Sequence, residues 1–122
     1  MKYENILVVD DSVTARLIIK KCFDIAVSGS LKYFFAENGL EALSIIDSEK
    51  IDLIITDMNM PKMDGSNFIK EMKSKDNKKS IPIVVISGIT NPEVEEELLN
   101  MGIYGIIRKP ISPAKIIELL GD

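Results

Sequence analysis

Five short runs rich in Ile, Val or aromatic residues recur along the chain, and stretches with helical spacing separate them. The runs are NILVVD (5–10), KYFFA (32–36), DLIITD (52–57), IPIVVIS (81–87) and YGIIR (104–108). Such alternation predicts strands joined by helices, the pattern of a parallel sheet covered on both faces. Three of the runs are almost continuously apolar, as central parallel strands are. We therefore expect an α/β fold, a doubly wound (βα)5 unit.

The segments between the runs place apolar residues three or four positions apart, which predicts one inward face for each helix. The residues expected on these faces are Ala15, Ile18, Ile19, Cys22 and Ala26; Leu40, Leu43 and Ile46; Phe68, Ile69 and Met72; Val94, Leu98 and Met101; and Ile116, Ile117 and Leu120. Two helix starts carry an N-cap residue followed by proline, at Asn91-Pro92 and Ser112-Pro113. With no linker or repeat in the sequence, we expect one domain over residues 1–122.

Composition excludes several classes of function. The formal net charge of -4 lacks the basic excess of proteins that bind a phosphate backbone, so direct nucleic-acid binding is not expected. No apolar run approaches the length of a membrane span, and we expect neither insertion nor export. The chain has no histidine, which excludes a Ser-His-Asp triad, a His-based zinc site and its own phosphohistidine chemistry.

Cysteine usage points to the cellular compartment. The chain has one cysteine, Cys22, so an internal disulfide is impossible. Its place on the apolar face of the first predicted helix favours a buried, unreactive thiol over a reactive one. A reducing cytoplasm fits this usage best.

Acidic side chains follow two of the predicted central strands. Asp10 and Asp11 close the first run, and Asp57 closes the third. These strands are neighbours in the flavodoxin-like order 2-1-3-4-5, and functional groups of such sheets gather beyond the carboxyl ends of the strands. Ser87 closes the fourth run and Lys109 follows the fifth, so all five side chains are expected at one edge of the sheet. Any single aspartate after a strand is more often an N-cap or turn residue. That alternative explains one aspartate well, but it explains the group of three less well.

Three carboxylates at one place need positive charge. Two unit charges 4 Å apart repel by roughly 4 kcal/mol at an effective dielectric constant of 20. A divalent cation together with Lys109 would offset this repulsion, and ligands that are all oxygen favour Mg²⁺ over zinc. One carboxylate could then attack phosphorus and form an acyl phosphate. Asp57 is the best candidate, because Pro61 and Gly65 in the following loop turn the chain away and leave the carboxylate at the rim.

Four motifs in order, ILVVDDS, DLIITDMNMPKMDG, IPIVVISG and RKP, resemble the receiver domains of two-component response regulators, of the stand-alone chemotaxis-regulator (CheY-like) type. The likeness covers the whole chain, although each motif alone is weakly specific. Such proteins have the flavodoxin-like fold with strand order 2-1-3-4-5; a member of the family is a standard example of that order, so this agreement is not independent support.

The resemblance implies a role for each site residue. Asp57 would be phosphorylated from the phosphohistidine of a sensor histidine kinase or a histidine phosphotransfer protein. Asp11, Asp57 and the backbone carbonyl of Asn59 would bind Mg²⁺ directly, and Asp10 would act through a bound water. Ser87 would donate a hydrogen bond to the phosphoryl group, and Lys109 would pair with it.

The resemblance also implies how the signal leaves the site. Lys109-Pro110 would be a cis peptide, a state that proline makes accessible. A downstream protein would read the face made by the fourth helix, fifth strand and fifth helix, about Pro92 to Leu120. Receivers commonly carry Tyr or Phe three residues before the lysine, and this chain has Ile106 there with Tyr104 two positions earlier. We therefore expect the usual aromatic switch to be absent. The alternative is that Ile106 is an ordinary apolar residue of the strand with no role in signalling.

Other functions remain as alternatives. A haloacid-dehalogenase-like phosphatase also uses an Asp nucleophile with Mg²⁺, but its D-x-D pair on the first strand differs from the adjacent Asp10 and Asp11 here. A phosphorylation-independent binding module, a pseudo-receiver, fits the fold but leaves the complete set of phosphotransfer residues unexplained. Flavin binding also fits the fold, but an acidic cluster repels a phosphate unless a metal intervenes. We expect a receiver rather than an enzyme with a separate substrate.

Overall fold

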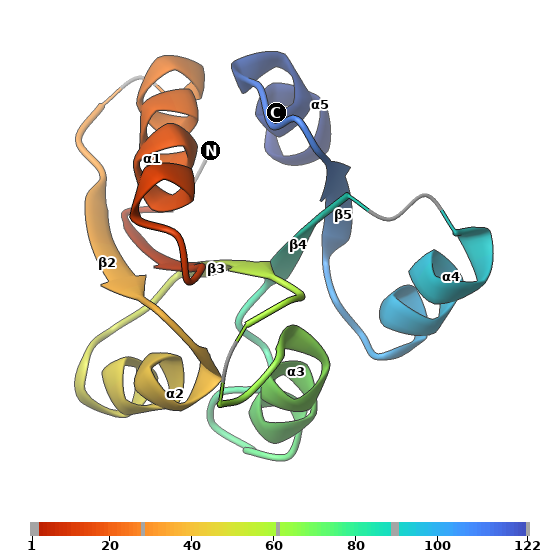
Figure 1. The fold of residues 1–122 in the computed structure, drawn as a ribbon. Coiled ribbons are helices and arrows are strands. Elements are labelled where there is room, and N and C mark those ends of the chain that lie inside the picture. The colour runs from red at the N-terminus through yellow and green to blue at the C-terminus, as the bar shows by residue number, and fades with distance from the viewer. Residues whose placement is uncertain (1–2, 28, 61, 89–90, 122) are drawn as a thin grey trace.

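The computed structural model describes residues 3–27, 29–60, 62–88 and 91–121. Within these residues five strands alternate with five helices along the chain (Figure 1). The strands are β1 (Asn5–Val9), β2 (Lys32–Ala36), β3 (Leu53–Asp57), β4 (Ile83–Ser87) and β5 (Gly105–Arg108). The helices are α1 (Val13–Ala26), α2 (Gly39–Ser48), α3 (Gly65–Lys73), α4 (Pro92–Asn100) and α5 (Pro113–Leu120). In this part of the chain, no helix has the length and apolar character needed to span a membrane.

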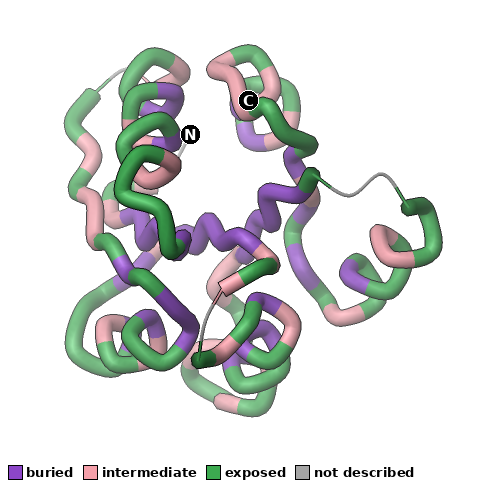
Figure 2. Tube along the Cα trace, in the orientation of Figure 1, coloured by how far each residue is buried: buried purple, intermediate pink, exposed green. Residues whose placement is uncertain are grey.

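The strands form one parallel sheet in the order β2-β1-β3-β4-β5, which confirms the predicted fold class and strand order. The three apolar runs occupy the centre of the sheet. β3 and β4 are buried along their whole length, whereas the edge strands β2 and β5 have exposed positions. Figure 2 shows this as a continuous buried band through the middle of the molecule. Apolar surface on both faces of these strands is what requires helices on both sides.

Two hydrophobic clusters lie on opposite faces of the sheet because neighbouring residues of a strand point to opposite sides. Leu7 and Val9 of β1 belong to the cluster under α2, α3 and α4, and Ile6 and Val8 belong to the cluster under α1 and α5. Figure 1 shows the same division, with α1 and α5 on one side of the sheet and α2 and α3 on the other. The helices therefore act as two covers for one central sheet.

Three residues expected on buried helix faces are exposed. Ile18, Leu40 and Ile117 have 47%, 51% and 50% of their surface accessible, so these assignments were wrong. In α1 the buried set is Ile19, Cys22 and Phe23, spaced by three and four residues, and this spacing turns Ile18 outward. The prediction for α3 was right, because Phe68, Ile69 and Met72 are all fully buried.

Strand boundaries are shorter than the apolar runs suggested. The fourth strand begins at Ile83 rather than at residue 81, since Pro82 has no N–H for the ladder, although its carbonyl accepts a bond from Ile54 N–H at 3.0 Å. β3 begins one residue later than expected, at Leu53, and β5 one residue later, at Gly105. Asp10 lies just beyond the end of β1.

The predicted helix starts at Asn91 and Ser112 are confirmed. The Asn91 side chain accepts a bond from the Glu93 N–H, and the Ser112 hydroxyl accepts one from the Lys115 N–H. Pro92 and Pro113 follow as the first helical residues, where a missing N–H leaves no bond unmade. The N-cap side chain and the proline after it therefore set the first residue of α4 and of α5.

Candidate functional site

The carboxyl ends of the parallel strands bring the predicted site residues to one edge of the sheet. Asp57 is the last residue of β3 and pairs in register with Ile86 of β4. Ser87, the last residue of β4, pairs with Arg108 of β5, which immediately precedes Lys109. This register brings the ends of β3, β4 and β5 side by side, although Asp57 and Lys109 lie 52 residues apart in the sequence.

Three carboxylates meet at this edge. One ligand oxygen from each of Asp10, Asp11 and Asp57 lies within 4.8 Å of the other two. Asp10 and Asp57 are buried, with 4% and 8% of their surface exposed, whereas Asp11 is exposed. Burial removes most of the water that would screen the two inner charges. The cluster is therefore a concentrated source of negative potential that opens to solvent at Asp11.

The environment of Asp10 shows the cost of this arrangement. Burial raises the pKa of Asp10 above its ordinary value of 3.8, and the nearby carboxylates of Asp57 and Asp11 raise it further. Two groups oppose this shift, the backbone N–H of Ser12, which donates to Asp10 Oδ1 at 2.9 Å, and the charge of Lys109. Since the net shift is upward, the cation and the hydrogen bond only partly offset the crowding of negative charge.

Lys109 supplies positive charge to the cluster. Its ammonium nitrogen lies 3.4 Å from Oδ1 of Asp57, a direct ion pair across the end of β4. The Lys109 side chain is half-exposed, and its backbone N–H donates to the Ser87 carbonyl at 2.9 Å. The Lys109-Pro110 peptide is cis, as the sequence resemblance implied. Lys109 thus joins the end of β5 to the nucleophile candidate on β3.

The remaining predicted residues take different positions. Ser87 is buried beside the cluster, at the end of β4. Asn59 lies in the loop after β3 and is exposed, and Pro110 is exposed beyond β5. Ile106 is half-buried in β5 and packs against the cluster under α2, α3 and α4. Tyr104 precedes β5 and is 51% exposed, so it does not replace the missing aromatic residue within the strand.

The loop after Asp57 is closed by an unusually tight approach at Gly65. The Gly65 N–H donates to the Met58 carbonyl at 3.0 Å, and a Cβ at Gly65 would lie 2.6 Å from the Asp57 carbonyl oxygen. Glycine is therefore required at the start of α3. The expectation that Pro61 also turns this loop lies outside the described residues.

Arg16 belongs to the site, but the sequence interpretation did not include it. Its guanidinium Nη1 donates to the backbone carbonyl of Asp10 at 2.6 Å. Arg16 is half-buried on the first turn of α1, so it holds the end of β1 against the helix that follows. The sequence feature that could have identified Arg16 is its position five residues after Asp11, on a helix that starts next to the site.

The donor set fits a hard divalent cation. The oxygens of Asp10, Asp11 and Asp57 lie within 4.8 Å of one another, and this group contains neither a thiol nor an imidazole. The loop after Asp57 offers backbone carbonyl oxygens next to them. Oxygen donors of this kind are the ligands that Mg²⁺ takes in proteins. A divalent charge would also offset the repulsion that raises the pKa of Asp10.

Comparisons with known proteins agree with the fold described above. Residues 6–121 match the sequence model of the response regulator receiver domain. Chemotaxis protein CheY-3 of Vibrio cholerae is 32% identical over 120 residues, which cover 98% of this chain and 90% of that protein. The solved structure of chemotaxis response regulator CheY4 of Vibrio cholerae has a TM-score of 0.84 and 30% identity, and covers 98% of this chain and 97% of that chain.

Some relatives are much longer than this chain. The cyclic di-GMP phosphodiesterase response regulator RpfG of Xanthomonas campestris is 29% identical over 112 residues. That match covers 92% of this chain but 29% of RpfG, so the likeness concerns one part of that protein. The family match, the relatives and the fold agree with one another: this chain belongs to the response regulator receiver domain family.

Proposed function

We propose that this chain, over residues 1–122, accepts a phosphoryl group on Asp57 from the phosphohistidine of a sensor histidine kinase or of a histidine phosphotransfer protein. One observation carries the proposal. The buried Asp57 carboxylate has an oxygen within 4.8 Å of oxygens of Asp10 and Asp11, and its Oδ1 lies 3.4 Å from the Lys109 ammonium. A carboxylate close to both a cation site and an ammonium can attack phosphorus, because these positive charges offset the negative charge of the carboxylate and of the phosphoryl oxygens.

The transfer balances as a simple displacement. A lone pair on an Asp57 carboxylate oxygen forms the new O–P bond, and the P–N bond of the phosphohistidine breaks. The electron pair of that bond remains on the imidazole nitrogen, and Asp57 becomes an acyl phosphate. The imidazole belongs to the partner, because this chain has no histidine.

Each neighbouring residue has a distinct role in this proposal. Asp11, Asp57 and the carbonyl of Asn59 would hold Mg²⁺, with Asp10 acting through a water. When bound, Mg²⁺ supplies positive charge that offsets the charge on the phosphoryl oxygens. Lys109 would pair with one phosphoryl oxygen, since its ammonium already reaches Asp57.

Ser87 would also bind the phosphoryl group. Its hydroxyl, at the end of β4 next to the β3 strand that ends at Asp57, would donate a hydrogen bond to another phosphoryl oxygen. The dianion on Asp57 would draw Ser87 and Lys109 inward and shift the surface around them. With Ile106 in β5, this shift reaches the surface without an aromatic rotamer change.

The downstream protein would bind the face formed by α4, β5 and α5, about Pro92 to Leu120. Chemotaxis-type signalling by protein contact and relay of the phosphoryl group to another protein are the two outputs consistent with the family. A cytoplasmic location is part of this proposal, because a lone buried cysteine suits a reducing compartment.

The decisive experiment is self-labelling with a small phosphodonor. Incubation with acetyl phosphate and Mg²⁺, followed by mass spectrometry of peptides, should place one phosphoryl group on Asp57. Asp57→Asn should abolish the label, whereas Asp47→Asn, which changes an exposed aspartate on α2, should leave it unchanged. Removal of Mg²⁺ with a chelator should also prevent labelling. Label that persists in Asp57→Asn, or steady turnover of phosphate esters without self-labelling, would contradict the proposal.

A further inference from the structure

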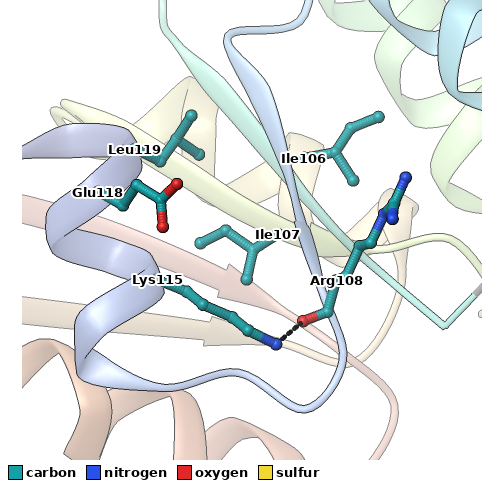
Figure 3. A pocket seen from close by; sticks show the side chains of 6 residues that line it. All are labelled: Ile106, Ile107, Arg108, Lys115, Glu118 and Leu119. Atoms are coloured by element: carbon teal, nitrogen blue, oxygen red, sulfur yellow. Dashed lines mark hydrogen bonds between the residues drawn. The ribbon is translucent and has the colours of Figure 1, made fainter.

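Lys115 holds the backbone on both sides of Lys109. Its ammonium donates to the carbonyl of Arg108 at 3.0 Å and to the carbonyl of Pro110 at 2.7 Å. These are the residues immediately before and after Lys109. Figure 3 shows the Lys115 side chain extending from α5 to the Arg108 carbonyl at the end of β5. The Lys115 side chain therefore bridges the backbone segment that carries Lys109, whose ammonium faces Asp57.

The position of Lys115 in α5 runs against local helix chemistry. Ser112 is the N-cap, and Lys115 is the third helical residue, whose own N–H the Ser112 hydroxyl caps. The third position of a first turn usually favours Glu or Gln, whose side chain can accept the N-cap N–H, and the positive end of the helix dipole disfavours a cation there. A lysine at this position is explained by its tertiary contacts with Arg108 and Pro110 rather than by helix formation.

The segment that Lys115 binds is also anchored from α4. The Arg108 side chain donates to both carboxylate oxygens of Glu95, at 3.0 and 2.7 Å. The Lys109 N–H is bound by the Ser87 carbonyl at 2.9 Å. Residues 108–110 are thus held by α4, β4 and α5, whereas the Lys109 side chain is 48% exposed.

The anchored backbone of residues 108–110, rather than the half-exposed side chain, indicates how the Lys109 ammonium is kept near Asp57. A long, half-exposed side chain samples many rotamers, and the position of its backbone limits where its ammonium can lie. Any shift of residues 108–110 would move the ammonium relative to Asp57, which now lies 3.4 Å away. A displacement of about 1 Å at a reacting group can lower a rate by about two orders of magnitude.

We infer that Lys115 is a positioning residue for phosphoryl transfer, which acts by fixing the backbone of Lys109 through the carbonyls of Arg108 and Pro110. The inference rests on the proposed phosphorylation of Asp57 and adds a residue to it. The hydrogen bonds of the Lys115 ammonium go to the carbonyls of Arg108 and Pro110 and not to the acid cluster. Its effect passes entirely through Lys109.

The cavity beside Lys115 allows a conservative test. An open cavity of about 370 Å³ lies between β5 and α5, and Lys115 lines it together with Arg108, Glu118 and Leu119. Methionine has a similar length but no donor, so Lys115→Met removes the two hydrogen bonds without leaving a large gap. Arginine keeps the charge and the donors, and the cavity provides room for its larger head group.

The experiment compares Lys115→Met, Lys115→Arg and Lys70→Met, an exposed-lysine control on α3. The initial rate of Asp57 labelling by acetyl phosphate should fall about tenfold in Lys115→Met and recover in Lys115→Arg, while Lys70→Met matches the unaltered chain. Calorimetric Mg²⁺ affinity should be the same in all four proteins. Exchange of the Lys109 backbone amide with solvent should be faster in Lys115→Met, a readout that does not depend on phosphorylation.

A double-mutant cycle separates positioning from general destabilisation. In a Lys109→Met background, adding Lys115→Met should lower the labelling rate by less than about twofold, because the group it positions is gone. An equal loss with and without Lys109, or unchanged labelling and amide exchange in Lys115→Met, would overturn the inference. Absence of label in the unaltered chain would instead overturn the proposed function, and with it the catalytic meaning of Lys115.

Discussion

The ammonium of Lys109 lies 3.4 Å from Oδ1 of Asp57, although β5 and β3, whose ends carry these residues, are not neighbours in the sheet. The Lys109 side chain crosses the end of β4 to make this contact. Its charge lowers the pKa of Asp10, opposing the effects of burial and of the other two carboxylates. The ion pair is therefore part of what makes a cluster of three acids tolerable at this edge.

Replacement of Lys109 by methionine should slow labelling of Asp57 by about a hundredfold, the scale of losing one charge-stabilising group at a reacting centre. The pKa of Asp10 should rise further, because the opposing positive charge is removed. Rates with acetyl phosphate and carboxylate titration by NMR measure the two effects. The same change at the exposed Lys70 should alter neither, and a labelling rate insensitive to Lys109 would exclude the proposed role.

Replacement of Asp10 by asparagine should stabilise the metal-free protein at pH 7. Removing one charge from the cluster should raise the free energy of unfolding by roughly 1–4 kcal/mol, the repulsion of two unit charges 4 Å apart between a water-like dielectric and an effective dielectric constant of 20. The asparagine oxygen can still accept the Ser12 N–H. Urea denaturation without Mg²⁺ checks this, and Mg²⁺ affinity should fall in the same variant. A less stable variant would show that the carboxylate repulsion is already relieved.

The pH dependence of that stabilisation has a definite sign. The pKa of Asp10 is raised above 3.8 in the folded protein, so the folded state holds this proton more tightly than the unfolded state. The destabilisation from ionised Asp10 is complete above the raised pKa and disappears as pH falls below 3.8. The stability difference between Asp10→Asn and the unaltered chain should therefore shrink at acidic pH. A difference that stays constant with pH would contradict this origin.

Replacement of Gly65 by alanine should damage both the fold and the site. The new Cβ would lie 2.6 Å from the Asp57 carbonyl oxygen and 2.9 Å from the Met58 Cα, and backbone atoms cannot move aside cheaply. We expect a loss of about 1–3 kcal/mol in the free energy of unfolding and weaker Mg²⁺ binding. Gly105→Ala is the matched control, because its close contact is the end of the flexible Leu119 side chain. Equal losses in both variants would contradict this distinction.

Cys22 should react slowly with thiol reagents while the protein is folded. The side chain is 8% exposed, and burial raises the pKa of its thiol above the ordinary value of 9.0, which lowers the reactive thiolate fraction. At pH 8 we expect labelling at least about a hundredfold slower than in urea. Because this is the chain's one cysteine, the reaction also reports opening of the interface between α1 and the sheet. Rapid labelling of the native protein would show that this interface opens readily.

The ion pair between Arg108 and Glu95 should be visible by NMR titration. The Arg108 guanidinium lowers the pKa of Glu95 below its ordinary value of 4.5, first through hydrogen bonds and then through charge. Its stabilising effect is present above 4.5 and is lost as pH falls through the lowered pKa. Arg108→Ala should return the titration midpoint of Glu95 to the ordinary value. A midpoint that does not move would place the carboxylate away from Arg108.

Much of the fold was predictable because its signals are local. The continuous apolar runs of β1, β3 and β4 predicted central strands, and the N-cap and proline pairs at Asn91 and Ser112 predicted two helix starts. The acids at the ends of β1 and β3 predicted the cluster, since carboxyl ends of parallel strands share one edge. The exposure of Ile18, Leu40 and Ile117 was not predictable from spacing, because helix rotation depends on which neighbours pack most closely.

The sequence by itself determined the alternation of strands and helices and the residue types gathered at the site, and the family resemblance supplied the strand order. Tertiary structure alone decided that Lys115 binds the carbonyls beside Lys109, that Arg16 binds the Asp10 carbonyl and that Gly65 lies against Asp57. Periodicity and capping act over a few residues and can be read along the chain. Contacts such as these depend on strand register, helix rotation and side-chain reach, which exist only once distant segments have packed together.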